Sequence, residues 1–192
     1  MKKFLLFYFV VICSVFATEI SEIEKYLDSI KTFEANFIQD DITGGALSEG
    51  LIYISRPDKL RVDYTHPFKA QVFTIGEQIT YYDQELDEIS NIPTGVTPLH
   101  FLLRKQITFA DFIVKKNEDK SDSISISIQE KKNKKQGTLF MTFTKNPLAL
   151  KSIRIKNELE QEIEMDFHKT KTNQEIKSKI FDFVSPRLKK KI

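Results

Sequence analysis

The sequence predicts a mainly β chain in which about eleven short strands form one large, strongly curved antiparallel sheet. Apolar and polar residues alternate along most of the chain, and a period of two marks strands that bury one face. Glycine and proline interrupt this alternation at short intervals, as Pro57, Pro67 and Gly76 do between residues 50 and 84. Two short apolar segments with helical features stand apart from the strands. They are expected to cover the apolar face of the sheet.

The first residues are expected to form a cleaved signal peptide and not a part of the fold. Lys2 and Lys3 precede an apolar segment that ends at Ile12, and a cleavage site follows at Ala17. The apolar segment is shorter than the ~20 residues that span a bilayer as a helix. A buried N-terminal strand or a membrane anchor is the alternative. The expected organisation is a signal peptide at residues 1–17 and a single domain at 18–192, which ends in a basic tail at 187–192.

The composition argues against several classes of function. The chain has 29 basic residues, and loss of Lys2 and Lys3 would leave 27 against 27 acidic ones. A nucleic-acid-binding protein needs a clear basic excess, so none is expected. The three histidines lie in unrelated segments, with no Cys or carboxylate at a catalytic or metal-binding spacing. We therefore expect neither an enzyme nor a bound metal or cofactor.

Residues 21–33 are expected to form an amphipathic helix. Ser21 and Glu24 have the spacing of a capping box, in which each side chain bonds the backbone of the other residue. The apolar residues of this segment recur at helical spacing and predict one buried face. They are Ile20, Ile23, Leu27 and Ile30.

Strands are expected on both sides of a central helical segment. The first six are expected at Thr32–Asp41, Leu47–Ser55, Lys59–Thr65, Lys69–Ile75, Gln78–Asp83 and Leu86–Ser90. The later ones are expected at Phe112–Asn117, Ser123–Glu130, Thr138–Lys145, Leu150–Asn157 and Glu162–Thr170.

The central segment predicts a short helix that acts as a lid. Thr97 suits the N-cap and Pro98 suits the first helical position. The following residues are apolar nearly all the way round, so this helix is expected to insert into the interior. A solidly filled core is one explanation, and a hollow interior with a movable lid is the other. The apolar lid residues are Leu99, Phe101, Leu102 and Leu103.

Several motifs resemble those of the LolA family, the periplasmic carriers of outer-membrane lipoproteins. Phe33–Gln39 matches the pattern F-x-A-x-F-x-Q of the first strand in that family. Gly50–Pro57 and Leu60–Tyr64 match the next two segments, and Phe181–Phe183 resembles the closing one. In order and spacing, the resemblance covers essentially the whole mature chain.

The resemblance implies an unclosed β-barrel with a helical lid over a hydrophobic cavity. It also implies a monomeric periplasmic carrier that takes triacylated lipoproteins from an inner-membrane ABC transporter to an outer-membrane acceptor. Arg56 stands where the family has an arginine that hydrogen-bonds the lid backbone and holds the empty form closed. The cavity is expected to be lined by Phe33, Phe37, Leu60, Val62, Tyr64 and Val72. Two alternatives share this fold: a periplasmic carrier of another lipid or glycolipid, and a lipid-sensing regulatory domain.

Overall fold

The structure is a computed structural model that describes residues 19–42, 45, 47–75 and 77–183. The expected signal peptide, its cleavage site and the basic tail lie outside the described residues. Within these residues, no helix has the length and apolarity required to cross a membrane.

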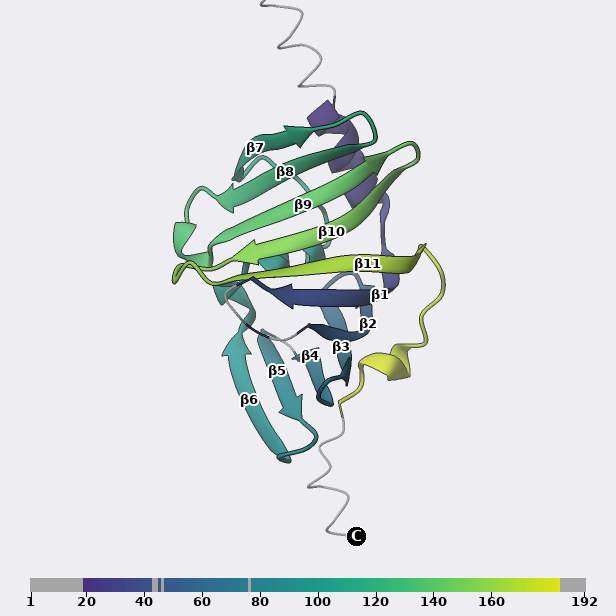
Figure 1. Ribbon diagram of the computed structural model, residues 1–192, viewed down its shortest axis with the longest axis vertical. Helices are drawn as coiled ribbons and strands as arrows, with labels where there is room; N and C mark the ends of the chain where they lie inside the picture. Colours follow the sequence, from purple (N-terminus) through teal and green to yellow (C-terminus); the bar gives the residue numbers. More distant parts are fainter. Residues whose placement is uncertain (1–18, 43–44, 46, 76, 184–192) are drawn as a thin grey trace, which may run out of the picture.

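One antiparallel sheet of eleven strands dominates the described structure (Figure 1). Its strand order is β6-β5-β4-β3-β2-β1-β11-β10-β9-β8-β7. Strands that follow one another in the sequence pair with each other, except β6 and β7. In addition β1 pairs with β11 and so joins the two sets. Strands β6 and β7 end the order without pairing to each other, so the barrel is unclosed, as predicted.

The strands occupy the eleven segments that the sequence predicts, with small differences at their ends. The first set is β1 Thr32–Asp41, β2 Ser48–Ser55, β3 Lys59–His66, β4 Ala70–Ile75, β5 Gln78–Asp83 and β6 Glu88–Pro93. The second set is β7 Phe112–Asp119, β8 Ser123–Glu130, β9 Thr138–Lys145, β10 Leu148–Lys156 and β11 Glu162–Thr172. The largest difference is at β6, which lies two to three residues further along the chain than predicted.

The alternation of the sequence places one set of side chains in a continuous core. In β9, Leu139, Met141 and Phe143 are all fully buried, whereas the alternate residues Phe140 and Thr142 are partly exposed. Burial of apolar surface is the main favourable term in folding, so this alternation fixes which face of each strand points inward.

An α-helix at residues 19–29 crosses the inner face of the β7–β10 half of the sheet (purple in Figure 1). The ring of Tyr26 meets Phe143 of β9 edge-on at 6.0 Å, and its hydroxyl accepts a hydrogen bond from the Leu150 N–H of β10. The predicted end at residue 33 is wrong, because β1 begins at Thr32 and pairs with β2 from its first residue. The predicted capping box is also wrong, since Ser21 lies inside the helix and the Glu24 carboxylate accepts from the backbone of Phe109.

The remaining helical segments are short 3-10 helices: η1 Thr94–Val96, η2 Pro98–Leu103, η3 Lys134–Gln136 and η4 Ser178–Phe181. The predicted lid is η2, and its N-cap is confirmed because the Thr97 hydroxyl accepts from the Leu99 N–H at 3.3 Å. Six residues allow only about two turns of this tight helix. Its position is therefore set by packing on the core.

Candidate functional site

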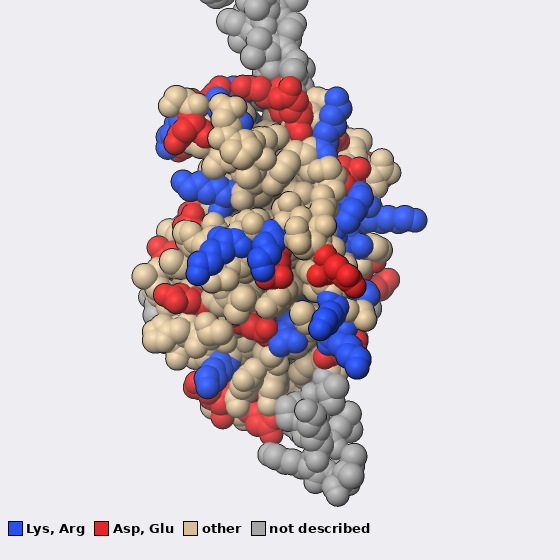
Figure 2. All heavy atoms as spheres, turned by 90° about the vertical axis from the view of Figure 1, so that its right-hand side faces the viewer, with Lys and Arg blue, Asp and Glu red and all other residues tan. Residues whose placement is uncertain are grey.

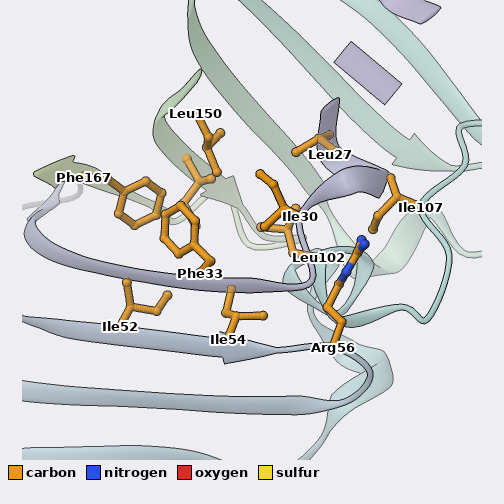
Figure 3. Close-up of a pocket in the computed structure, with 11 residues that line it drawn as sticks. Leu27, Ile30, Phe33, Ile52, Ile54, Arg56, Leu102, Ile107, Leu150 and Phe167 are labelled. Carbon is orange, nitrogen blue, oxygen red and sulfur yellow. The ribbon is translucent and has the colours of Figure 1, made fainter. Parts of the chain in front are cut away.

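An apolar pocket lies inside the curve of the sheet, beneath the helix at residues 19–29 and η2 (Figure 3). Figure 3 shows Phe33 and Phe167 toward one end and Arg56 and Ile107 toward the other. Among the described residues that line the pocket, Arg56 is the only polar one. The full set is Leu27, Ile30, Phe33, Ile52, Ile54, Arg56, Leu102, Ile107, Leu150, Ile153 and Phe167.

The pocket is small. Its cavity volume is about 30 Å³, which is room for a water-sized group and not for a hydrocarbon chain. The open, oily interior expected from the sequence is therefore not present in this state. The reason is that side chains from the helix, the lid and the strands fill most of the space inside the sheet. An apolar chain would fit in the pocket only if some of these elements moved apart.

The sequence prediction identified the lining of the pocket only in part. Phe33 lines it, whereas Phe37, Leu60 and Val62 are buried elsewhere in the same core. Tyr64 and Val72 are partly buried and pack against that core. The residues that the prediction missed come mainly from β2, β10, β11 and the helix. The apolar stripe of the helix, which includes Leu27 and Ile30, was the available signal for two of them.

Arg56 directly follows β2 and has a deeply buried guanidinium, with a side chain that is 3% exposed. Its Nη2 donates a hydrogen bond to the backbone carbonyl of Asp28 at 2.7 Å and lies 3.7 Å from the Asp28 carboxylate. Its Nε is buried without a hydrogen-bond partner among the described residues. Burial lowers the pKa of Arg56, and the nearby Asp28 carboxylate opposes this change.

The resemblance implied that Arg56 bonds the backbone of the lid, and the structure places its bond elsewhere. The acceptor belongs to the last turn of the helix at residues 19–29. Carbonyl groups at a helix C-terminus lack partners within the helix and carry partial negative charge, so they attract a buried cation. Arg56 thus joins the end of β2 to the helix, and η2 is attached through a neighbouring residue.

That attachment is a backbone hydrogen bond from Asp58 to Leu103 at 2.9 Å. Most other contacts of η2 are apolar. Phe101 is fully buried, stacks on Phe109 at 5.7 Å and meets Phe112 edge-on at 4.9 Å. Leu102 and Leu103 are also buried and Leu99 packs on the core, but only Leu102 of η2 lines the pocket.

The segment that follows the lid is held by the helix at residues 19–29. The backbone N–H of Ile107 donates to the Asp28 carboxylate at 2.8 Å, and that of Phe109 donates to the Glu24 carboxylate at 2.6 Å. These two acceptors are four residues apart and therefore lie on the same side of the helix. Glu24 was predicted to belong to a capping box, and no role was predicted for Asp28.

A second hollow lies on the other side of η2. It is a polar groove of about 620 Å³, a size typical of ligand sites. Arg104 at its edge bonds Glu130 at 3.0 Å and lies over the ring of Phe112 at 4.8 Å. The groove is lined by Pro57, Asp58, Lys59, Thr74, Glu77, Thr94, His100, Leu103, Arg104, Ser178, Phe181 and Asp182.

One face of the surface carries charges of both signs. Figure 2 shows basic and acidic side chains intermixed on the face turned to the viewer. In the part of the chain that the structure describes, no three His, Cys, Asp or Glu residues are grouped to hold a metal ion.

Comparison with known sequences identifies a protein family that matches most of the chain. The family described as "Outer membrane lipoprotein carrier protein LolA" matches residues 28–184. An outer-membrane lipoprotein carrier protein of Francisella tularensis is 25% identical over 195 residues, which cover 97% of this chain and 95% of that protein. An uncharacterized protein of Rickettsia prowazekii is 25% identical over 170 residues, or 88% of this chain and 78% of its own. A carrier protein of Methylococcus capsulatus is 35% identical, but over only 36% of each chain.

Solved structures share the fold at low sequence identity. An uncharacterized conserved protein from Thermus thermophilus has a TM-score of 0.54 and 7% identity, covering 88% of this chain and 95% of that one. MucB has a TM-score of 0.52 and 10% identity, covering 88% of this chain and 64% of that one. At such identities the likeness concerns the fold alone.

Proposed function

The chain belongs to the LolA family of outer membrane lipoprotein carrier proteins, and from this premise we propose that it carries lipoproteins across the periplasm. In this proposal it binds the acyl chains of triacylated lipoproteins released by an inner-membrane ABC transporter. It then delivers them to an outer-membrane acceptor. It works as a monomer, catalyses no reaction and needs no cofactor.

The observation that carries the proposal is the apolar pocket beneath the lid. An acyl chain of about fifteen methylenes, at about 0.8 kcal/mol each, costs roughly 12 kcal/mol to expose to water. No lipoprotein can cross an aqueous compartment unaided at that cost. A curved sheet that is apolar inside and charged outside can shield the chain while the complex stays soluble.

The small size of the pocket fits a carrier that opens to take up its cargo and must also release it. Opening a closed form costs free energy, and that cost is subtracted from the affinity for the acyl chain. Loading then needs an energy source, which the transporter supplies through ATP, and release to a stronger binder is downhill. Arg56 contributes to closure in this proposal, because its bond to Asp28 holds the end of β2 against the helix.

The test is to purify the mature protein from the periplasm and identify co-purified material by mass spectrometry. We expect triacylated lipoprotein. A free lipid or glycolipid as the main species would favour a carrier of another lipid, and the absence of any acylated material would contradict transport. Leu102→Trp, which fills the pocket from the lid, should lower the yield of cargo, whereas Leu159→Ser at a position that is 77% exposed should not.

Transfer is tested separately with Arg56→Leu. If Arg56 helps to close the empty form, the variant loads normally but retains its cargo when it is mixed with acceptor and outer membranes. Transfer at the wild-type rate would exclude this role for Arg56.

A further inference from the structure

The lid η2 separates two hollows of different character, one apolar and one lined by both apolar and charged residues. Leu102 faces the apolar pocket, whereas Leu103 and His100 line the polar groove. The turn between β2 and β3 also lies between the two hollows, because Arg56 lines the pocket and Pro57 lines the groove. A displacement of η2 would therefore join the apolar pocket and the polar groove into one amphiphilic site.

The boundary between the two hollows holds an unused hydrogen-bond donor. The Nε–H of Arg56 has no acceptor among the described residues, although its side chain is only 3% exposed. Buried donors in proteins are nearly always paired, because an unpaired one loses its bond to water without replacement. A donor left free at the end of an apolar pocket is suited to bind an oxygen that arrives with an apolar ligand.

The groove itself is polar and carries charges that no other described residue neutralises. The carboxylates of Asp58, Glu77 and Asp182 form no ion pair with another described residue, and the same holds for the ammonium of Lys59. Arg104 is paired with Glu130. Among the described residues that line the groove, the charges without an ion pair are thus three negative and one positive, which favours a polar ligand with basic groups over one with acidic groups.

We propose that the groove binds the polar peptide segment next to the acylated end of the cargo, and that Arg56 Nε donates to an ester carbonyl oxygen of the acyl linkage. The acyl chains lie in the pocket, the carbonyl lies at Arg56, and the peptide continues past Pro57 into the groove. This inference rests on the proposed carrier function and adds a second subsite to it.

The first experiment locates the peptide. A synthetic triacylated lipopeptide with one serine and four lysines is mixed with protein that carries a photo-crosslinking amino acid at Lys59, in the groove, or at Leu159, which is 77% exposed and does not line it. Co-elution from a gel-filtration column measures capture, and irradiation measures the position of the peptide. We expect crosslinks at position 59 and few at 159. A matching peptide with four glutamates should crosslink less at position 59.

The outcomes separate the inference from the function on which it rests. Capture of the probe with equal crosslinking at both positions would overturn the proposal that the groove binds the peptide, but it would not contradict the carrier function. Failure to capture any acylated probe would overturn both. Equal crosslinking of the lysine and glutamate peptides would overturn the charge preference.

The second experiment tests the carbonyl. Forms of the same lipopeptide whose two glyceryl chains are ester-linked or ether-linked differ only in the ester carbonyl oxygens, because both keep the amide-linked third chain. We expect the wild-type protein to bind the ester form about fivefold more tightly, the effect of about one hydrogen bond. Arg56→Met, which keeps the length and loses the donor, should bind both forms equally. No preference in the wild-type protein would overturn the role of Arg56 Nε.

Discussion

The backbone N–H of Asp58 donates to the carbonyl oxygen of Leu103 at 2.9 Å, across the junction between the β2–β3 turn and the last residue of η2. Among the described residues this is the only backbone hydrogen bond that joins Pro98–Leu103 to the β2–β3 turn. One net hydrogen bond is worth about 1 kcal/mol. The position of the lid must therefore depend mainly on apolar packing, since Phe101, Leu102 and Leu103 are all buried.

Phe101→Leu should loosen the lid more than the sheet. The substitution removes the ring contacts with Phe109 and Phe112 and is expected to cost about 1–2 kcal/mol. We expect stronger binding of a fluorescent apolar dye under native conditions, because the open form becomes more populated.

The matched control is Phe143→Leu, an equally buried position in β9 whose ring meets Tyr26. It should lower the melting temperature by a similar amount without raising native dye binding. Equal dye binding by the two variants would show that general loosening, and not the lid, controls access.

Glu24→Ala should free the segment that follows the lid. The Phe109 N–H would lose its acceptor, at an expected cost of about 1–2 kcal/mol. Amide hydrogen exchange, followed by NMR, should become faster at Phe109 than at β9 residues such as Met141. Glu22→Ala is the control, because it removes the same charge from an exposed position of the same helix. Unchanged exchange at Phe109 would show that Glu24 does not restrain this segment.

The strands could be predicted from the sequence because their signal is local. A residue such as Ile126 is flanked by serines, and this contrast alone places it inward. The pairing of β1 with β11 carries no local signal, since Phe37 and Phe167 are partners from opposite ends of the chain. The expected curvature was correct, but the pairing that produces it depends on the tertiary structure.

The pocket was harder to predict for the same reason. Leu150 and Phe167 reach it because β10 and β11 pair next to β1, which the order of strands in the sequence does not reveal. The partner of Arg56 is the C-terminal turn of a helix, and the sequence placed the end of that helix four residues too late. Motif matching therefore identified Arg56 but could not identify Asp28.

Gly50→Ala should destabilise the fold. A Cβ at Gly50 would lie 2.0 Å from the Asp63 carbonyl oxygen and 2.8 Å from the ring of Phe37. Backbone and ring would both have to shift, and overpacking of this kind costs about 1–3 kcal/mol. Gly95→Ala is the control, because a Cβ there would meet nothing within 4 Å. Chemical denaturation should give a lower midpoint for the first variant alone, and an unchanged midpoint would mean that β2 and β3 can separate at little cost.

Tyr64 should make the fold sensitive to alkaline pH. Its hydroxyl donates to Gln39 at 2.8 Å, and burial, with a smaller effect from Tyr81, raises the pKa of Tyr64 from 10.0 to about 12. The unfolded chain then loses this proton more easily than the folded one. The stabilisation is complete below the unfolded pKa of 10.0 and is lost as the pH rises toward the folded value of about 12.

Two pK units correspond to about 2–3 kcal/mol, so the free energy of unfolding should fall by up to that amount over this window because of Tyr64 alone. Tyr64→Phe removes the titrating group and should flatten the decline measured by urea denaturation between pH 9 and pH 12 (roughly the window set by the linkage relation). Tyr53→Phe is the comparison, because Tyr53 is more exposed and burial raises its pKa less. Lysine deprotonation affects both variants alike, so the difference between their slopes isolates Tyr64. Identical slopes would mean that the Tyr64 hydroxyl reaches water in the folded protein.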